Sequence, residues 1–237
     1  MVETSLKALL FDVFGTVVDW RSSITREGQA LGRAKGLERD WQEFADRWRA
    51  GYQPAMTEVR EGRRPWTILD VLHREILDRI LGEFDIDGMD DAEKDDLNRA
   101  WHRLDPWPDV VAGMSRLKTD YILGTLSNGN VALMVNMAKR AGLPWDVILG
   151  AEVAGHYKPD PDAYKKSVSL LGLDPGQAML VAAHNGDLRA AAACGLRTAF
   201  IRRPTEYGPD QDFDMEPDED WDFVADGFGD LADQLGV

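Results

Sequence analysis

Five short apolar runs constrain the fold of this chain more than any other feature of its sequence. Each run is bounded by polar residues or glycine, as the buried strands of a parallel sheet are. The runs are Ala8–Phe11 and residues 121–126, 147–149, 179–183 and 198–201. We expect each of them to form a strand of one sheet.

Segments with the pattern of helices lie between the later runs. Pro108 and Asp109 can open a helix that extends to about residue 118. Asp160 followed by Pro161 is typical of an N-cap and a first helical position, and Gly172 would end that helix. The alternation of strands and helices predicts an α/β fold whose core is a doubly wound, Rossmann-like parallel sheet.

A stretch of about a hundred residues after the first run shows no strand pattern. Its apolar residues recur three and four positions apart, as on one face of an amphipathic helix. The sets are Trp41, Phe44, Ala45, Trp48 and Tyr52; Leu69, Leu72, Ile76 and Ile80; and Leu97, Trp101 and Leu104. We expect a helical-bundle cap, residues 19–104, over the C-terminal end of a core formed by residues 1–18 and 105–237. The aromatic set is expected to form the core of the cap rather than to stack on a substrate.

Charge and composition limit the possible partners. The 237 residues carry a formal net charge of −15, of which −12 falls after Arg203, where no lysine or arginine occurs. We interpret that segment as a solvated acidic surface. Nucleic-acid binding is disfavoured because it requires clustered lysine and arginine, and no apolar run approaches the roughly 20 residues of a membrane span. The single cysteine, Cys194, excludes an internal disulfide, so a cytoplasmic location is expected.

An aspartate follows the first apolar run, at the strand end where open α/β sheets keep their chemistry. Asp12 would be ionised at neutral pH and able to act as a nucleophile. Gly15 lets the backbone approach a ligand closely, and the Thr16 hydroxyl can hold one carboxylate oxygen. Phe14 adds an aromatic ring to the same loop. The motif is weak by itself, because an aspartate after a strand is often a turn or cap residue.

Two further strings place polar groups beside that aspartate. Ser127 and Asn128 end the second core strand and can present donors to an anion, although the same pair is common in simple turns. Lys158 precedes the helix that begins near Asp160 and would supply a positive charge, unless it is an ordinary loop lysine.

The last string also follows a strand and contains His184, Asn185 and Asp187. A histidine there can act as a base, because the imidazole titrates near neutral pH. Asp187 can orient the histidine or bind water. A structural role for His184 is equally consistent with the sequence.

These four strings, in this order and spacing, resemble the haloacid dehalogenase superfamily over nearly the whole chain. The resemblance is strongest to its type II, L-2-haloacid dehalogenase branch. It implies that Asp12 is the nucleophile and that Arg49, on the first cap helix, receives the departing halide. The residues assigned to catalysis are Asp12, Thr16, Arg49, Lys158, His184 and Asp187, and those assigned to substrate binding are Phe14, Ser127, Asn128, Tyr164 and Asn185.

The fourth motif departs from the family pattern. Ala182 and His184 stand where serine and asparagine are usual, and Gly186 stands where many members have tryptophan. The arrangement that activates water is therefore not a direct copy of the family's. We expect His184, together with Asp187, to take this role.

Phe14 favours a dehalogenase over a phosphatase. Phosphatases of the superfamily have an acid at that position to protonate the leaving alkoxide, and they use Mg²⁺. A halide leaves without a proton, so we expect hydrolysis of small 2-haloacids to 2-hydroxy acids through an ester on Asp12, with no metal or other cofactor.

Three alternatives stay open. They are the opening of a strained-ring amine on a 2-carboxylate, a Mg²⁺-dependent phosphatase, and a binding module without activity. A homodimer is a further open expectation, because Trp66 and Trp107 fit either an interface or the core.

Overall fold

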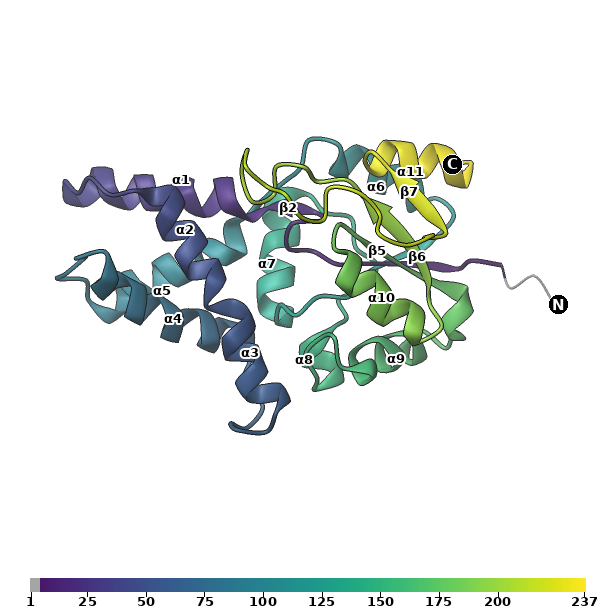
Figure 1. Ribbon diagram of the computed structural model, residues 1–237, viewed down its shortest axis with the longest axis horizontal. Helices are drawn as coiled ribbons and strands as arrows, with labels where there is room; N and C mark the ends of the chain where they lie inside the picture. The colour runs from purple at the N-terminus through teal and green to yellow at the C-terminus, as the bar shows by residue number, and fades with distance from the viewer. Residues whose placement is uncertain (1–4) are drawn as a thin grey trace.

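A computed structural model describes residues 5–237 of the chain. At its centre is a five-stranded parallel sheet in the order β4-β1-β5-β6-β7, with helices on both faces (Figure 1). The strands are β1 Ala8–Phe11, β4 Ile122–Thr125, β5 Ala178–Ala182, β6 Arg197–Ile201 and β7 Phe223–Ala225. The predicted α/β class with a doubly wound parallel sheet is confirmed.

Helices cover both faces of the sheet, because alternate side chains of a strand point to opposite sides. Leu9 and Phe11 of β1 pack in one cluster with residues of α6, α7 and α11, whereas Ala8 and Leu10 pack with residues of α9 and α10. The core helices are α6 Val110–Leu117, α7 Val131–Ala141, α8 Ala151–Ala154, α9 Pro161–Leu170, η2 Pro175–Gln177, α10 Asn185–Ala193 and α11 Phe228–Leu235. None of the helices in the described part of the chain is long and apolar enough to cross a membrane.

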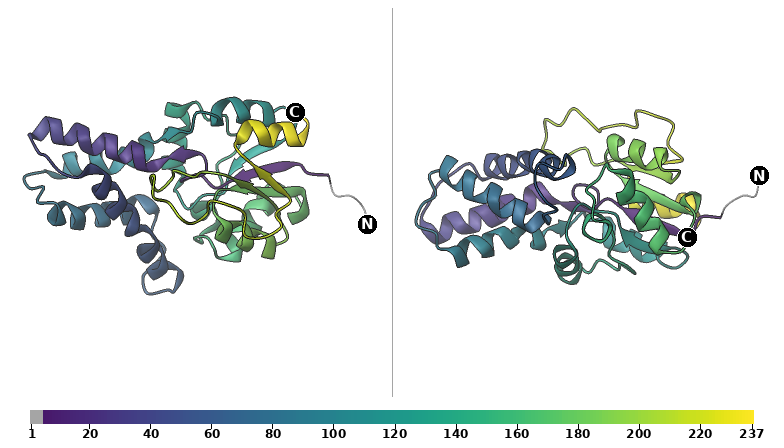
Figure 2. Two further views of the ribbon diagram at one scale, coloured as in Figure 1. Left: turned by 45° about the horizontal axis from the view of Figure 1, so that its top comes forward. Right: turned by 90° about the horizontal axis from the view of Figure 1, so that it is seen from below.

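A second lobe of helices lies beside the carboxyl ends of the strands (Figure 2). The chain enters this lobe through β2 (Val18–Asp19) and leaves it through β3 (Asp105–Pro106), and these two short strands pair antiparallel. The helices of the lobe are α1 Trp20–Lys35, α2 Trp41–Ala50, α3 Tyr52–Arg60, α4 Leu69–Glu83, α5 Asp91–Asn98 and η1 Arg99–Arg103. The predicted domain division stays a prediction: a core of residues 1–18 and 105–237, and a cap of residues 19–104. Residues 1–4 of that core lie outside the described part of the chain.

The aromatic set of the second lobe is buried, as expected for a cap core. Trp41, Phe44 and Trp48 lie on α2, and the rings of neighbouring members pack edge to face. Gly51 separates α2 from α3, so the set falls on two helices, and Tyr52 begins the second. Tyr52 is also the member of the set that reaches the cavity described below.

One expected strand is absent, and one strand was not predicted. Residues 147–149 form no strand: Val147 makes only an isolated parallel bridge to Gly124 beyond β4, so the pairing is too short to continue the sheet. The fifth strand is instead β7, in the acidic C-terminal segment, where it pairs with β6. Its three residues lie between Asp222 and Asp226, which breaks the apolar pattern that would have indicated a strand.

Candidate active site

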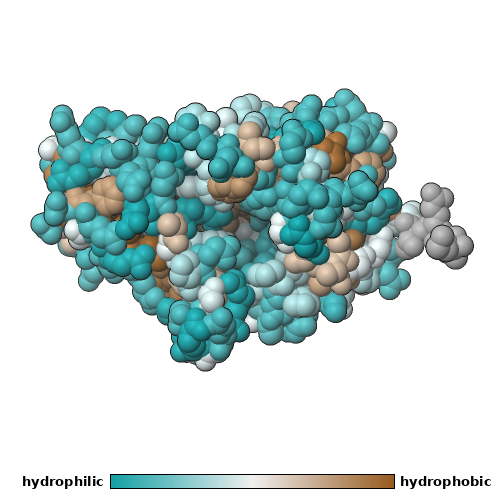
Figure 3. Space-filling view, viewed as in Figure 1, coloured by the Kyte–Doolittle hydropathy of each residue, from teal (hydrophilic) through white to brown (hydrophobic). Residues whose placement is uncertain are grey.

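The carboxyl ends of β1, β4 and β5 meet at a cavity of about 490 Å³ between the sheet and the second lobe. The space-filling view shows a hollow between the two lobes, with mainly hydrophilic residues around it (Figure 3). Eight of the eleven predicted site residues line this cavity, and the exceptions are Thr16, Ser127 and Asn185. The topology therefore brings together residues that are more than 170 positions apart, such as Asp12 and His184.

Three groups bind the Asp12 carboxylate, which is 7% exposed. Thr16 Oγ1 donates to Oδ2 at 2.9 Å, Lys158 Nζ donates to Oδ1 at 2.9 Å, and His184 Nδ1 lies 3.1 Å from Oδ2. Burial by itself would raise the pKa of Asp12, but Lys158 and His184 hold it well below its ordinary value. Asp12 is therefore an ionised carboxylate at neutral pH, with both oxygens held by fixed donors.

Lys158 joins Asp12 to Asp187. Its Nζ also donates to Asp187 Oδ2, and the other oxygen of Asp187 accepts from the Tyr164 hydroxyl at 2.5 Å. The backbone N–H of Lys158 donates to Asn128 Oδ1 at 2.8 Å, which fixes the loop that carries the lysine. Burial would lower the pKa of Lys158, but the charges of Asp12 and Asp187 raise it above its ordinary value, so the ammonium stays charged.

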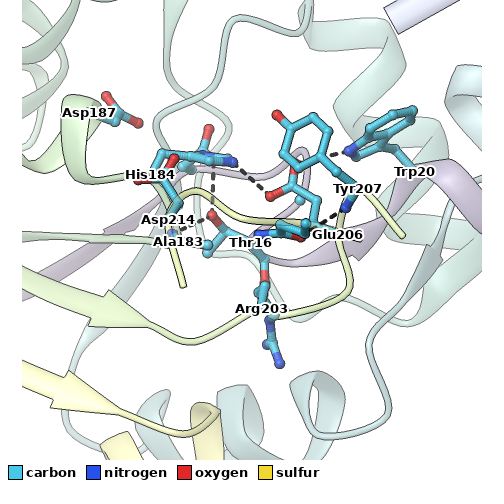
Figure 4. Close-up of polar contacts among 12 residues, drawn as sticks. Thr16, Trp20, Ala183, His184, Asp187, Arg203, Glu206, Tyr207 and Asp214 are labelled. Atoms are coloured by element: carbon cyan, nitrogen blue, oxygen red, sulfur yellow. Dashed lines mark hydrogen bonds and ion pairs between the residues drawn. The ribbon is translucent and has the colours of Figure 1, made fainter. Parts of the chain in front are cut away.

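His184 lies between two carboxylates, and neither is Asp187. Its Nε2 is 2.8 Å from Glu206 Oε2, and Trp20 Nε1 donates to the other Glu206 oxygen at 2.9 Å (Figure 4). Burial would lower the pKa of His184, but Glu206 and Asp12 raise it well above its ordinary value, so the resting imidazole is protonated. The expected pair of His184 with Asp187 is wrong, because Lys158 and Tyr164 hold that carboxylate.

Arg49 lies among aromatic rings rather than against a carboxylate. Its guanidinium carbon is 4.2 Å from the ring centroid of Tyr52, 5.4 Å from that of Trp20 and 5.8 Å from that of Phe14. Its Nη1 is buried without a hydrogen bond, and no carboxylate in residues 5–237 forms an ion pair with it. An unpaired donor on a buried charged group is costly, so this atom suits an anion in the cavity.

Two of the residues that do not line the cavity support its wall. Thr16 is fully buried, and its hydroxyl accepts from the backbone N–H of Ala183 at 2.9 Å while it donates to Asp12. Ser127 is also fully buried, and its hydroxyl accepts from the backbone N–H of Gly129 at 3.1 Å. The Ser127 side chain thus shapes the turn after β4 instead of facing the cavity.

Asn185 was expected to bind substrate, but it holds a loop instead. Its amide oxygen accepts from Trp221 Nε1 at 2.9 Å, and its amide nitrogen donates to Asp214 Oδ1 at 2.9 Å. All of these contacts go to the segment between β6 and β7. The side chain has its polar atoms committed there and does not line the cavity.

The segment between β6 and β7 supplies site residues that the sequence did not indicate. Tyr207 and Asp214 line the cavity, and Glu206 is only 1% exposed beneath it. The interpretation of the acidic C-terminal segment as a solvated surface is therefore wrong for Glu206. No motif or periodicity marks this residue, and its role appears only when the chain after β6 lies beside the loop after β1 and beside His184. On the cap side, Gln53 and Arg60 of α3 were also missed.

Gly15 gives the Glu206 carboxylate room. Its φ of 87° lies in the left-handed region, and a Cβ at this position would be 2.0 Å from Glu206 Oε1. The glycine was expected to admit a ligand, but the group that approaches it is this carboxylate. Trp107, an open choice between core and interface, packs on the core and donates from Nε1 to the Gly15 carbonyl at 2.7 Å.

The family model for haloacid dehalogenase-like hydrolases matches residues 6–195. The chain belongs to this family. A curated relative, (S)-2-haloacid dehalogenase 4A from Burkholderia cepacia, is 30% identical over 210 residues, which are 86% of this chain and 87% of the relative.

Two crystal structures extend this similarity. A defluorinating L-2-haloacid dehalogenase is 52% identical, with a TM-score of 0.96 over 98% of this chain and 96% of its own. Another L-2-haloacid dehalogenase is 53% identical, with a TM-score of 0.95 over 98% of this chain and 99% of its own. The predicted resemblance to the type II branch is confirmed.

Proposed function

We propose that the protein is a hydrolytic dehalogenase that releases halide from small 2-haloacids and forms the corresponding 2-hydroxy acids. The observation that carries this proposal is the ionised Asp12 carboxylate in one cavity with Arg49, whose buried Nη1 has no hydrogen-bond partner among the described residues. An attacking anion and a site for a departing anion are what displacement of halide from carbon requires. The similarity to named 2-haloacid dehalogenases supports the proposal.

In the first half-reaction, Asp12 attacks C2 of the substrate and the carbon–halogen bond breaks. The bonding pair leaves with the halide toward Arg49, and an ester to Asp12 forms with inversion at C2. Phe14 and Tyr52 flank the guanidinium, so little water competes with the halide for its N–H groups. No proton is transferred in this step, so an acid is not needed at position 14, where this chain has Phe14.

The substrate carboxylate needs its own donors in the same cavity. We assign it to the loop after β4, where Asn128 lines the cavity and the backbone turns at Ser127. Backbone N–H groups of such a turn can bind a carboxylate without a charged side chain. The Ser127 hydroxyl contributes by fixing this turn.

In the second half-reaction, water attacks the acyl carbon of the Asp12 ester. Alkylation removes the negative charge beside His184 Nδ1, while Nε2 stays on Glu206. His184 can then release its Nδ1 proton to the cavity and accept a proton from the attacking water. That proton passes to the oxygen of the departing 2-hydroxy acid. The second proton of the water then moves from the acyl product to His184 Nδ1, which restores both the Asp12 carboxylate and the imidazolium. Lys158 stabilises the oxyanion on the way.

The alternatives fit the geometry less well. A phosphatase would require an acid two residues after Asp12, but Phe14 cannot donate a proton and packs edge-on against Trp101. A strained-ring amine would require a proton donor on the side opposite the attacking oxygen. The protonated His184 contacts Asp12 itself and so lies on the attacking side.

Two experiments test the proposal. In a single turnover in ¹⁸O-labelled water, the label should enter Asp12 first, and label found directly in the product would contradict an ester intermediate. Asp12→Asn should abolish halide release from 2-chloropropionate while the circular dichroism spectrum is unchanged. Turnover of an aryl phosphate that depends on Mg²⁺, without halide release from any fluoro-, chloro- or bromo-acid, would favour the phosphatase instead.

A further inference from the structure

A second arginine of the cavity, Arg60, has no charged partner in the described part of the chain. Most arginines of the second lobe form ion pairs, as Arg21 does with Asp46 and Arg64 with Glu75. Arg60 lines the cavity, and within residues 5–237 its guanidinium donates only to neutral oxygens. In a chain with 42 acidic residues, a cavity arginine without a carboxylate is unusual.

Arg60 lies at the end of α3 and crosses to the core side of the cavity. Its Nη1 donates to the backbone carbonyl of Lys158 at 3.0 Å, and its Nη2 donates to Thr57 Oγ1. The ammonium of the same lysine binds Asp12 at 2.9 Å. The Arg60 guanidinium therefore binds the backbone of the same residue whose side chain binds the nucleophile.

A second polar side chain of α3 lines the cavity with Arg60. Gln53 is seven residues earlier on α3, so the two side chains project from the same face of the helix, and both line the cavity. The cavity of about 490 Å³ is larger than a three-carbon haloacid requires. Asp214, which also lines the cavity, has its Oδ1 held by the Asn185 N–H groups.

We propose that Arg60 recognises a second anionic group at the distal end of the substrate. The class of substrate that it selects is a 2-halodicarboxylate, such as 2-chlorosuccinate, over a 2-haloacid with an apolar tail. The reasons are the free N–H groups of a guanidinium, their fit to the two oxygens of a carboxylate, and the polar neighbour Gln53. This inference rests on the proposed function. In that function Asp12 and Arg49 act at C2, and the loop after β4 binds the carboxylate attached to C2, so a second carboxylate would need another partner.

The test is the ratio of kcat/KM for 2-chlorosuccinate to kcat/KM for 2-chloropropionate. Arg60→Gln should lower this ratio about tenfold or more, the usual effect of losing a hydrogen bond between charged groups. Arg60→Lys keeps the charge but not the paired donors. Its kcat/KM ratio should therefore lie between those of the wild type and Arg60→Gln. The matched control is Arg63→Gln, which removes the same charge just after α3 from an exposed pair with Glu58, and should leave the ratio unchanged.

An unchanged ratio in Arg60→Gln, with both substrates still turned over, would overturn the inference and leave Arg60 as a tie between α3 and the Lys158 loop. If the wild-type enzyme releases halide from neither acid, the proposed function fails separately. The inference is then judged by calorimetric binding of malate and lactate, the matching hydroxy acids. A selective loss of malate binding in Arg60→Gln supports it, and an equal loss of both contradicts it.

Discussion

Glu206 connects parts of the site that are far apart in the sequence. Its carboxylate accepts from Trp20 and contacts His184, and it fills the space beside Gly15. A buried carboxylate with these partners holds a neighbouring imidazole in one orientation and keeps it charged. At the scale of single residues, Glu206 therefore decides what His184 can do.

Glu206→Gln should slow ester hydrolysis by about 100-fold or more, the usual contribution of general acid–base catalysis. The amide keeps the shape of the side chain but cannot stabilise the His184 imidazolium. Halide release in the first turnover should persist, so we expect a burst of about one halide per site followed by a slow phase. Rapid-quench halide measurement and the intact mass of the alkylated enzyme check this.

Trp20→Phe is the control for that variant, because it removes one hydrogen bond to Glu206 but leaves the carboxylate and a ring beside Arg49. We expect a smaller loss than in Glu206→Gln. Wild-type turnover by Glu206→Gln, with no accumulated ester, would remove the carboxylate from the mechanism.

Lys158→Met should move the acidic limb of kcat/KM for halide release to higher pH. In the wild type, the pKa of Asp12 is held well below its ordinary value, so the nucleophile stays ionised as the pH falls to about 4. Without the ammonium, burial is opposed by fewer charges and the pKa of Asp12 rises. The limb should move by at least about one pH unit.

Lys166→Met makes the same chemical change on the exposed face of α9, where the lysine pairs with Asp162. It should leave the pH profile of halide release in place. Identical acidic limbs in Lys158→Met and the wild type would mean that Lys158 does not control the ionisation of Asp12.

The sequence marks the residues that follow strands, and it misses those that only tertiary structure brings near. Asp12, Asn128 and His184 were predictable because strand ends meet at one edge of a parallel sheet. Glu206 lies in an irregular acidic segment, 186 residues from its partner Trp20, so no local pattern could indicate it. The predicted pair of His184 with Asp187 was wrong for the same reason, because the carboxylate at His184 Nε2 is that of Glu206.

At the scale of elements, the loop after β1 has a left-handed backbone at position 15, which glycine adopts without strain. Gly15→Ala should destabilise the protein by about 1–3 kcal/mol, the cost of a strained non-glycine backbone, and lower the melting temperature by about 2–4 °C for each kcal/mol. Its Cβ would also displace Glu206, so ester hydrolysis should slow as in Glu206→Gln. Differential scanning calorimetry and burst kinetics measure the two effects.

Gly82→Ala separates the special role of Gly15 from a general effect of adding a methyl group. A Cβ at position 82, in the last turn of α4, meets no atom within 4 Å, and the backbone there is helical. Alanine should be neutral or stabilise the helix by up to about 1 kcal/mol. If Gly15→Ala and Gly82→Ala had the same melting temperature and the same burst kinetics, the predicted strain at position 15 would be contradicted.

The predictability of the elements follows the strength of their local patterns. β1 and β5 are apolar runs buried on both faces, and α9 carries its Asp160 cap, so the sequence places them within a residue or two. β7 has three residues between acidic neighbours and exists only because β6 offers an edge to pair with. Short strands of this kind are specified by their partner rather than by their own sequence.

At the scale of the whole molecule, a pair of reciprocal hydrogen bonds joins the helical lobe to the loop that carries Asn128. The backbone N–H of Asp70, on α4, donates to Asn130 Oδ1 at 3.2 Å, and Asn130 Nδ2 donates to Asp70 Oδ2 at 2.8 Å. His102 Nε2 lies 3.0 Å from the other oxygen of Asp70. Burial would raise the pKa of Asp70, but His102 and Asn130 lower it.

Asn130→Asp replaces an amide donor with a carboxylate of the same shape, directly facing Asp70. At pH 7 the two negative charges should destabilise the protein by about 1–3 kcal/mol, because a buried donor is lost and a repulsion added. One carboxyl then has a folded-state pKa above its unfolded value. The destabilisation is therefore present at high pH and disappears as the pH falls through that raised pKa, so the difference in melting temperature from the wild type should shrink toward pH 4.

Asn136→Asp is the matched control, because it adds the same charge beside the other ring nitrogen of His102, 3.0 Å from the present amide. The new carboxylate there faces an imidazole rather than a second carboxylate, so the loss at pH 7 should be smaller than in Asn130→Asp. The Asn130 variant should also raise KM more than it lowers kcat, since the reciprocal pair sets the position of the substrate loop against the helical lobe rather than the chemistry at Asp12. Parallel melting curves for the two variants at every pH, with unchanged KM, would show that the pair does not couple the lobes.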